Sequence, residues 1–148
     1  MKRFVSCILL VVLIAGIIPV YAMASEREFI YQDDGSYIIV ELINKGARAS
    51  GTISGGKAYT YYGSNGASAW KAVLNGTFNY TGSGATCTAS SVDVTIYDSS
   101  WYIISKSANK SGSTATGSVT MGLKSAGVTV SRVPVSLTLS CDANGNLS

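Results

Sequence analysis

Apolar residues occupy every second position through most of the stretch from Trp70 to Cys141, in segments separated by short polar turns. A period of two is that of a β-strand with one buried face. The alternation is clearest near the end, where Val133, Val135 and Leu137 are separated by polar residues or Pro134. Pro134 has no backbone N–H, so we expect an edge strand there. The pattern predicts five strands: Trp70–Tyr80, Ala85–Tyr97, Trp101–Ser107, Thr114–Leu123 and Val128–Cys141.

Two further strands are predicted upstream. Ser36–Ile43 is rich in β-branched residues, and Ala58–Gly63 is placed to form a hairpin with Trp70–Tyr80. Between them, Asn44–Lys57 carries four glycines and looks like a linker. We therefore divide the chain into a leader at 1–24, a lead-in strand and Gly/Ser/Ala-rich linker at 25–57, and a compact domain at 58–148.

Short antiparallel strands with turns about every 8–12 residues are typical of a β-sandwich or a barrel. We favour the sandwich. The predicted fold class is therefore all-β: an antiparallel β-sandwich, Ig-like in general architecture, with one disulfide and preceded by an N-terminal signal helix.

The first 24 residues have the features of a secretory signal peptide. Lys2 and Arg3 precede an apolar run, and Ala22-Met23-Ala24 supplies small residues at alternate positions. We expect cleavage between Ala24 and Ser25, with the domain secreted and free of the membrane afterwards. The alternative is an uncleaved anchor, because Phe4–Ala24 is just long enough to cross a bilayer of about 30 Å.

The charge balance changes once the leader is removed. The chain has 11 Lys and Arg against 8 Asp and Glu. Without Lys2 and Arg3, nine basic residues face the same eight acids, and the net charge is near +1. The remaining basic residues form no cluster, so the sequence indicates neither nucleic acid nor an anionic membrane as a partner.

Cys87 and Cys141 are the two cysteines that lie beyond the leader. In an oxidising compartment an even number of cysteines indicates a bridge. A Cys87–Cys141 disulfide closes a loop of about 55 residues and contributes at most about 4 kcal/mol. The alternative is two unlinked, buried thiols.

The chain offers few groups for catalysis. It has no histidine, which excludes Ser-His-Asp and Cys-His arrangements. Asp93 and Asp98 are the candidates for a paired-carboxylate hydrolase, but a solvated strand face and a turn explain them more simply. Two thiolates do not complete a zinc site. We therefore expect no enzymatic activity, no metal and no cofactor.

Aromatic residues are the one feature that favours a binding role. Exposed rings give a large contact area at a small entropic cost, whereas buried rings only pack the core or pair across strands. Trp101 directly follows a turn, where side chains are often half exposed. The candidate binding aromatics are Tyr59, Tyr61, Tyr62, Trp101 and Tyr102.

Several strings of residues occur together in one order: Tyr59-Thr60-Tyr61-Tyr62, Leu74-Asn75-Gly76-Thr77-Phe78, Ala85-Thr86-Cys87-Thr88, Ile96-Tyr97-Asp98-Ser99-Ser100-Trp101-Tyr102 and Leu139-Ser140-Cys141-Asp142. This set resembles a group of small secreted proteins of Gram-positive, Clostridia-type bacteria with no assigned activity. The resemblance covers most of the mature chain from Asp34 onward. It implies bacterial export and a single disulfide-bearing domain, and it identifies no functional residue.

These observations lead to two functional expectations. The first is a secreted, non-enzymatic β-domain that binds cell-wall glycan or a surface protein. The second is a secreted, bacteriocin-like antagonist, which would inhibit the growth of related bacteria.

Overall fold

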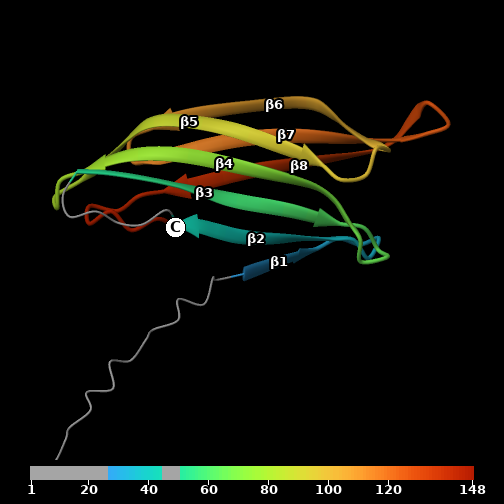
Figure 1. The fold of residues 1–148 in the computed structure, drawn as a ribbon, viewed down its shortest axis with the longest axis horizontal. Coiled ribbons are helices and arrows are strands. Elements are labelled where there is room, and N and C mark those ends of the chain that lie inside the picture. The colour runs from blue at the N-terminus through green and yellow to red at the C-terminus, as the bar shows by residue number, and fades with distance from the viewer. Residues whose placement is uncertain (1–26, 45–50) are drawn as a thin grey trace, which may run out of the picture.

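The computed structural model describes residues 27–44 and 51–148 (Figure 1). The larger of its two antiparallel sheets contains β1 (Arg27–Tyr31), β2 (Tyr37–Asn44), β3 (Gly51–Tyr62), β4 (Ser68–Tyr80) and β5 (Ala85–Ile96). The smaller contains β6 (Trp101–Ser111), β7 (Thr114–Ser125) and β8 (Val128–Ser140). The predicted leader at 1–24, its cleavage site between Ala24 and Ser25, and residues 45–50 of the predicted linker lie outside the described residues.

Strands that are neighbours in each sheet are also neighbours in the sequence. The all-β fold with two antiparallel sheets is thus confirmed, and Pro134 lies in β8 at a sheet edge as predicted. The connectivity differs from that of Ig domains, whose sheets combine strands distant in sequence. Here few residues separate consecutive strands in the sequence, which leaves no length for such crossings. Within the described ranges we find no helix of the length and apolar character needed to cross a membrane.

The two sheets pack face to face through the alternating apolar residues. The predicted inward face of β4 is buried, with Trp70, Leu74 and Phe78 fully inaccessible to solvent. Met121 and Leu139 of the smaller sheet are equally buried. At Gly117 of β7 the sheets come so close that a Cβ there would lie 2.7 Å from Val92 Cγ2. Gly117 therefore permits a separation that a larger residue would prevent.

Residues 51–57 correct the prediction of a linker, because they form the first part of β3. Gly55 and Gly56 are buried. A side chain on Gly55 would overlap Leu147, and one on Gly56 would crowd Asn75. These glycines serve close packing rather than flexibility. β2 pairs with β3, and β1 pairs with β2, so the lead-in strand also belongs to the compact fold.

β5 departs from the predicted pattern towards its end. Val92 is buried as expected, whereas Ile96 is 39% exposed. β5 is an edge strand of the larger sheet, and the smaller sheet has only three strands with which to cover it. The alternation therefore indicates a strand correctly, but it does not indicate where the covering layer ends.

Candidate functional site

Most of the aromatic residues expected to bind a ligand are buried. Tyr59, Tyr61 and Trp101 are only 7%, 5% and 7% exposed. The expectation that Trp101 is half exposed is therefore wrong. Tyr62 and Tyr102 are half-buried. The Tyr102 ring lies over Gly122, its hydroxyl is 2.6 Å from the Thr129 hydroxyl, and the Lys124 ammonium lies 4.3 Å from its centroid.

Two of these buried rings form an aromatic cluster with Trp70. Tyr61 of β3 and Trp101 of β6 have ring centroids 5.0 Å apart, with planes inclined by 58°. This tilted geometry suits the quadrupoles of aromatic rings. The indole Nε1 of Trp70 has no hydrogen-bond partner within the described part of the chain. The cluster joins the two sheets, because Trp70 and Tyr61 belong to one sheet and Trp101 to the other.

Above this cluster lies a depression of about 690 Å³, which we call the loop-end hollow. Its walls come from three turns at one end of the strands, residues 32–36, 63–67 and 97–100, at the right in Figure 1. Tyr61 and Trp101 line it from below. The other residues that line it are Asp34, Ser36, Gly63, Ser64, Asn65, Ala67, Ser68, Ala69, Tyr97, Asp98, Ser99 and Leu123.

Hydrogen bonds fix several polar side chains of the hollow. Asp34 Oδ1 accepts from the backbone N–H of Ser36 at 2.9 Å and from its hydroxyl at 2.5 Å. These two bonds, the hydroxyl first, lower the pKa of Asp34, so its side chain is a carboxylate at neutral pH. In the neighbouring turns Asn65 Oδ1 accepts from Ala67 N at 3.0 Å, and Asp98 Oδ1 accepts from Ser100 N at 2.9 Å.

The turns themselves are tied together. The N–H groups of Tyr97 and Asp98 both donate to the carbonyl of Ala69, at 2.9 and 3.0 Å. Gly35, with a φ of 82°, packs next to the side chain of Ser64. Glycine adopts this left-handed conformation without strain. The side chains of Asp34, Asn65 and Asp98 are therefore held in place before any ligand arrives.

The structure does not bring the two acids of the hydrolase hypothesis together in the hollow. Asp98 lines the hollow, but Asp93 lies further along β5, where it accepts a hydrogen bond of 2.8 Å from Asn75 Nδ2. The second carboxylate of the hollow is instead Asp34, which was not among the candidates predicted from the sequence. Among the described residues there is no group of three or more His, Cys, Asp or Glu side chains suited to hold a metal ion.

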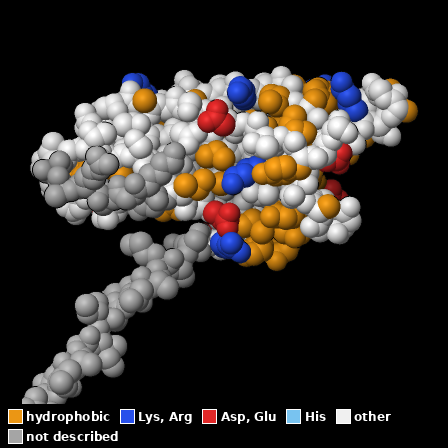
Figure 2. Space-filling model, in the orientation of Figure 1, with side chains coloured by type: hydrophobic (Ala, Val, Ile, Leu, Met, Phe, Trp, Pro, Cys, Tyr) orange, Lys and Arg blue, Asp and Glu red, His pale blue; other side chains and the backbone are white. Residues whose placement is uncertain are grey.

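A second aromatic feature covers the outer face of the larger sheet. We call Phe29, Tyr31, Tyr37 and Tyr62 the outer aromatic patch. Register places Tyr31 opposite Tyr37 and Tyr37 opposite Tyr62. Figure 2 shows hydrophobic side chains gathered over β1 and β2 beside an acidic and a basic residue. Only Tyr62 of this patch was among the sequence candidates, because Arg27–Tyr31 shows no alternation of apolar and polar residues that would single out Phe29 and Tyr31.

The rings of the outer aromatic patch are poorly placed to stack on a flat ligand. Tyr37 and Tyr62 are parallel within 7°, with centroids 5.0 Å apart, so each covers a face of the other. Phe29 and Tyr31 are similarly arranged, 16° from parallel with centroids 6.3 Å apart. The patch consequently presents ring edges and hydroxyls, which suit a protein surface better than a sugar ring.

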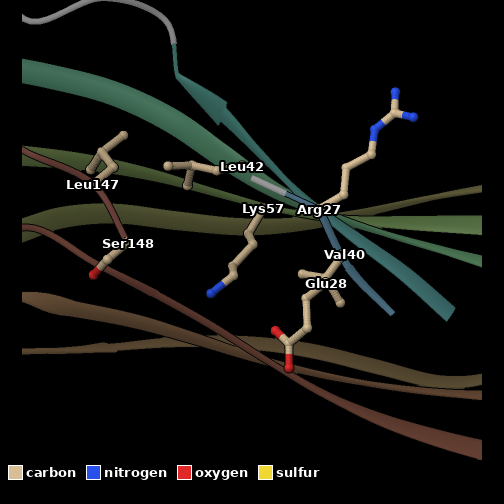
Figure 3. Close-up of a pocket in the computed structure, with 7 residues that line it drawn as sticks. All are labelled: Arg27, Glu28, Val40, Leu42, Lys57, Leu147 and Ser148. Carbon is tan, nitrogen blue, oxygen red and sulfur yellow. The ribbon is translucent and has the colours of Figure 1, made fainter. Parts of the chain in front are cut away.

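An open groove of about 420 Å³ lies on the other side of β1 (Figure 3). Glu28 and Lys57 extend into it, and Leu147 and Ser148 form its far wall. Arg27 points away from the groove and pairs with Glu41 at 2.6 Å. The residues that line the groove include one acid, Glu28, two bases, Arg27 and Lys57, and no aromatic residue, so it offers less than the loop-end hollow for ligand recognition.

Cys87 and Cys141 are buried free thiols in the structure, so the predicted disulfide is not formed there. They flank one turn: Cys87 N donates to Gly112 O at 2.7 Å, and Cys141 N donates to Ser113 O at 3.0 Å. Burial is the main cause that raises the pKa of both thiols. The Lys110 charge opposes this rise at Cys87, whereas the Asp142 charge adds to it at Cys141.

Comparison with known proteins gives little beyond this geometry. The crystal structure of a hypothetical protein from Listeria monocytogenes EGD-e is similar, with a TM-score of 0.49 and 16% sequence identity, over 83% of this chain and 91% of that chain. No protein-family model and no curated protein sequence matches the chain. Function can therefore be inferred only from the chain's own residues.

Proposed function

We propose that the chain is a secreted, non-enzymatic domain that binds a cell-surface glycan in the loop-end hollow. One observation supports this most: the hollow combines fixed carboxylate, amide and hydroxyl groups with aromatic side chains. A sugar presents hydroxyls around its rim and C–H bonds on its faces. Polar groups around an apolar surface match both features.

The aromatic part of this site comes from Tyr97 and Trp101. Tyr97 is 53% exposed at the rim, where its ring is free to meet the face of a sugar. Trp101 and Tyr61 lie deeper and supply apolar contact. Such rings lose little conformational entropy when a ligand binds.

The carboxylate of Asp34 favours binding over hydrolysis. A glycosidase needs one carboxylic acid whose raised pKa keeps it protonated. The pKa of Asp34 is lowered instead, because it accepts hydrogen bonds from Ser36. An ionised Asp34 accepts hydrogen bonds from sugar hydroxyls but has no proton to give. With no histidine in the chain, we propose recognition without turnover.

Calorimetric titration with solubilised cell-wall glycan fragments tests this proposal. We expect Tyr97→Ala to weaken binding at least about tenfold, since such a loss corresponds to about 1.4 kcal/mol. Tyr31→Ala is the matched control, because Tyr31 is 74% exposed but lies outside the hollow. Absence of binding to every fragment, or equal losses in the two variants, would contradict the proposal.

We also propose that Cys87 and Cys141 form a disulfide after export. The two cysteines flank the same turn, and Cys87 is close enough for its charge to raise the pKa of Cys141. Burial keeps both thiols protonated, which slows spontaneous oxidation because the thiolate is the reactive form. Intact mass under non-reducing conditions tests this. Secreted protein should lack two hydrogens relative to the reduced chain, and an unchanged mass would contradict the bridge.

A further inference from the structure

We propose that β1 is a docking edge for a second copy of this chain, which pairs with it antiparallel to form one continuous sheet. β1 spans Arg27–Tyr31 and pairs with β2 through all five residues without a bulge. All five residues are exposed. No segment within 27–44 or 51–148 pairs with its other side. Unpaired backbone N–H and C=O groups on such an edge are a template for another strand.

The other sheet edges are protected, which sets β1 apart. The edge of β5 faces β6, whose Lys106 ammonium donates to the Val92 carbonyl at 3.4 Å and whose Lys110 ammonium donates to the Thr88 carbonyl. β8 contains Pro134, and its Ser140 exchanges two backbone hydrogen bonds with Ser148, at 2.9 and 3.0 Å. β1 has neither proline nor lysine, and it exposes two large aromatic side chains.

The composition of β1 suits pairing with itself in one register. A two-fold axis through Phe29 places Phe29 opposite its own copy, Arg27 opposite the second copy's Tyr31, and Glu28 opposite its Ile30. All five residues then pair, and Arg27 meets an aromatic ring, a favourable contact. A slip of one residue would turn the aromatic side chains to opposite faces. An axis through Glu28 would set two like charges against each other, which is destabilising.

The same register would join the two outer aromatic patches. Phe29 is 47% and Tyr31 74% exposed in one copy. Directly opposed side chains on one face of an antiparallel pair lie about 4.5–5.5 Å apart, so Phe29 would bury much of its exposed surface against its copy. This supplies the apolar contact that backbone hydrogen bonds alone do not. The inference is independent of the proposed glycan site, whose residues lie elsewhere.

Analytical ultracentrifugation of the isolated protein up to about 1 mM tests the pairing. We expect a reversible dimer, and we expect Phe29→Lys to raise its dissociation constant at least about tenfold. The control is Val130→Lys, which changes a 57% exposed residue of β8 and should leave the constant unchanged. A monomer at every concentration, or a dimer that tolerates Phe29→Lys, would overturn the proposal.

Cysteine cross-linking tests the register. In the Phe29-centred register, the thiols introduced by Phe29→Cys in the two copies would face each other at a Cα separation of about 4.5–5.5 Å, within the range for a disulfide. Tyr31→Cys is the matched control, because the two copies of residue 31 would lie about 13 Å apart along the strands. We expect Phe29→Cys to give a covalent dimer on mild oxidation and Tyr31→Cys to give none. The reverse result would overturn the register, and no cross-link at either position would overturn the pairing.

Discussion

Tyr61 lies flat against Trp70, with ring centroids 5.2 Å apart and planes within 4° of parallel. The two residues are opposite each other in the register of β3 and β4. Trp101, from the other sheet, lies 6.2 Å from Trp70, measured between ring centroids. The aromatic cluster that joins the two sheets at this end therefore also forms the base of the loop-end hollow, through Tyr61 and Trp101.

Removing Trp70 should therefore destabilise the fold strongly. We expect Trp70→Ala to lower the free energy of unfolding by about 3–5 kcal/mol, because it leaves a large cavity. Trp70→Phe should cost markedly less, because it keeps most of the volume and removes an N–H group that has no partner among the described residues. Urea denaturation followed by circular dichroism measures both. Tyr31→Ala, at a 74% exposed residue, should stay within about 0.5 kcal/mol of the parent.

Gly117 should tolerate no side chain. An added Cβ would lie 2.7 Å from Val92 Cγ2 and 3.2 Å from Leu74 Cδ1, so we expect Gly117→Ala to cost about 1–3 kcal/mol by overpacking. In a Val92→Ala background the same change should cost less, since the clashing methyl group is gone. Gly84→Ala, where a Cβ would meet no atom within 4 Å, is the control. Additive effects of the Gly117 and Val92 changes would contradict this account of the sheet contact.

Stability of the reduced protein should fall in alkali. Burial raises the pKa of Cys87, Cys141 and Tyr59 in the folded state. The stability that these three protonated groups contribute is fully present below their unfolded-state pKa values. It is lost as pH rises through their higher folded-state pKa values. For the thiols this loss begins above about pH 8.5, and for Tyr59 above about pH 10.

A variant with Cys87→Ala and Cys141→Ala separates these contributions. Its urea midpoint should stay level until pH passes the pKa of an unfolded-state tyrosine, about 10, because the pKa of Tyr59 is raised only in the folded state. Oxidised protein should behave in the same way, because a disulfide has no thiol to titrate. If the reduced parent and the variant lose stability over the same pH range, the raised thiol pKa values do not matter to the fold.

Asp142 should hold the C-terminal turn. Its carboxylate accepts hydrogen bonds from the N–H groups of Asn144 and Asn146, both 2.8 Å, and from Asn146 Nδ2 at 2.7 Å. These bonds lower its pKa, with the Asn146 side chain as the main cause. The Asp142 carboxylate therefore stabilises the turn fully above about pH 4. This stabilisation is lost as pH falls through the lower folded-state pKa of Asp142.

Hydrogen exchange at the Asn146 amide measures this support directly. We expect Asp142→Ala to accelerate exchange there, and acid to act on the turn in the same direction once the intrinsic rate is taken into account. Asp93→Ala, which removes an acid bonded to Asn75 instead, is the control. Unchanged protection of Asn146 in Asp142→Ala would contradict this role of the Asp142 carboxylate.

Alternation alone predicted the strands from Trp70 onward, because one buried face per strand imposes a period of two. It failed at residues 51–57, where small glycines permit close packing but resemble a flexible linker in sequence. The expectation of a half-exposed Trp101 was also wrong. A tryptophan after a turn is exposed or buried according to what covers it, and here Tyr61 and Trp70 lie against it.

The alternation of apolar and polar residues could not predict the loop-end hollow. Asp34, Asn65 and Asp98 come from three separate turns, and only the pairing of the strands brings these turns to one end. Each residue by itself looks like a turn former, and the hydrogen bonds confirm that role. Their second role as a shared polar wall requires the three-dimensional arrangement.

An NMR titration of ¹⁵N-labelled protein with cell-wall glycan fragments tests the central claim most directly. We predict that amide signals of the three turns shift together, above all those of Asp34, Asn65, Tyr97 and Asp98. Signals of Phe29 and Tyr31 on β1 should stay in place. Shifts confined to β1, or no shift with any fragment, would contradict the glycan site at the loop-end hollow.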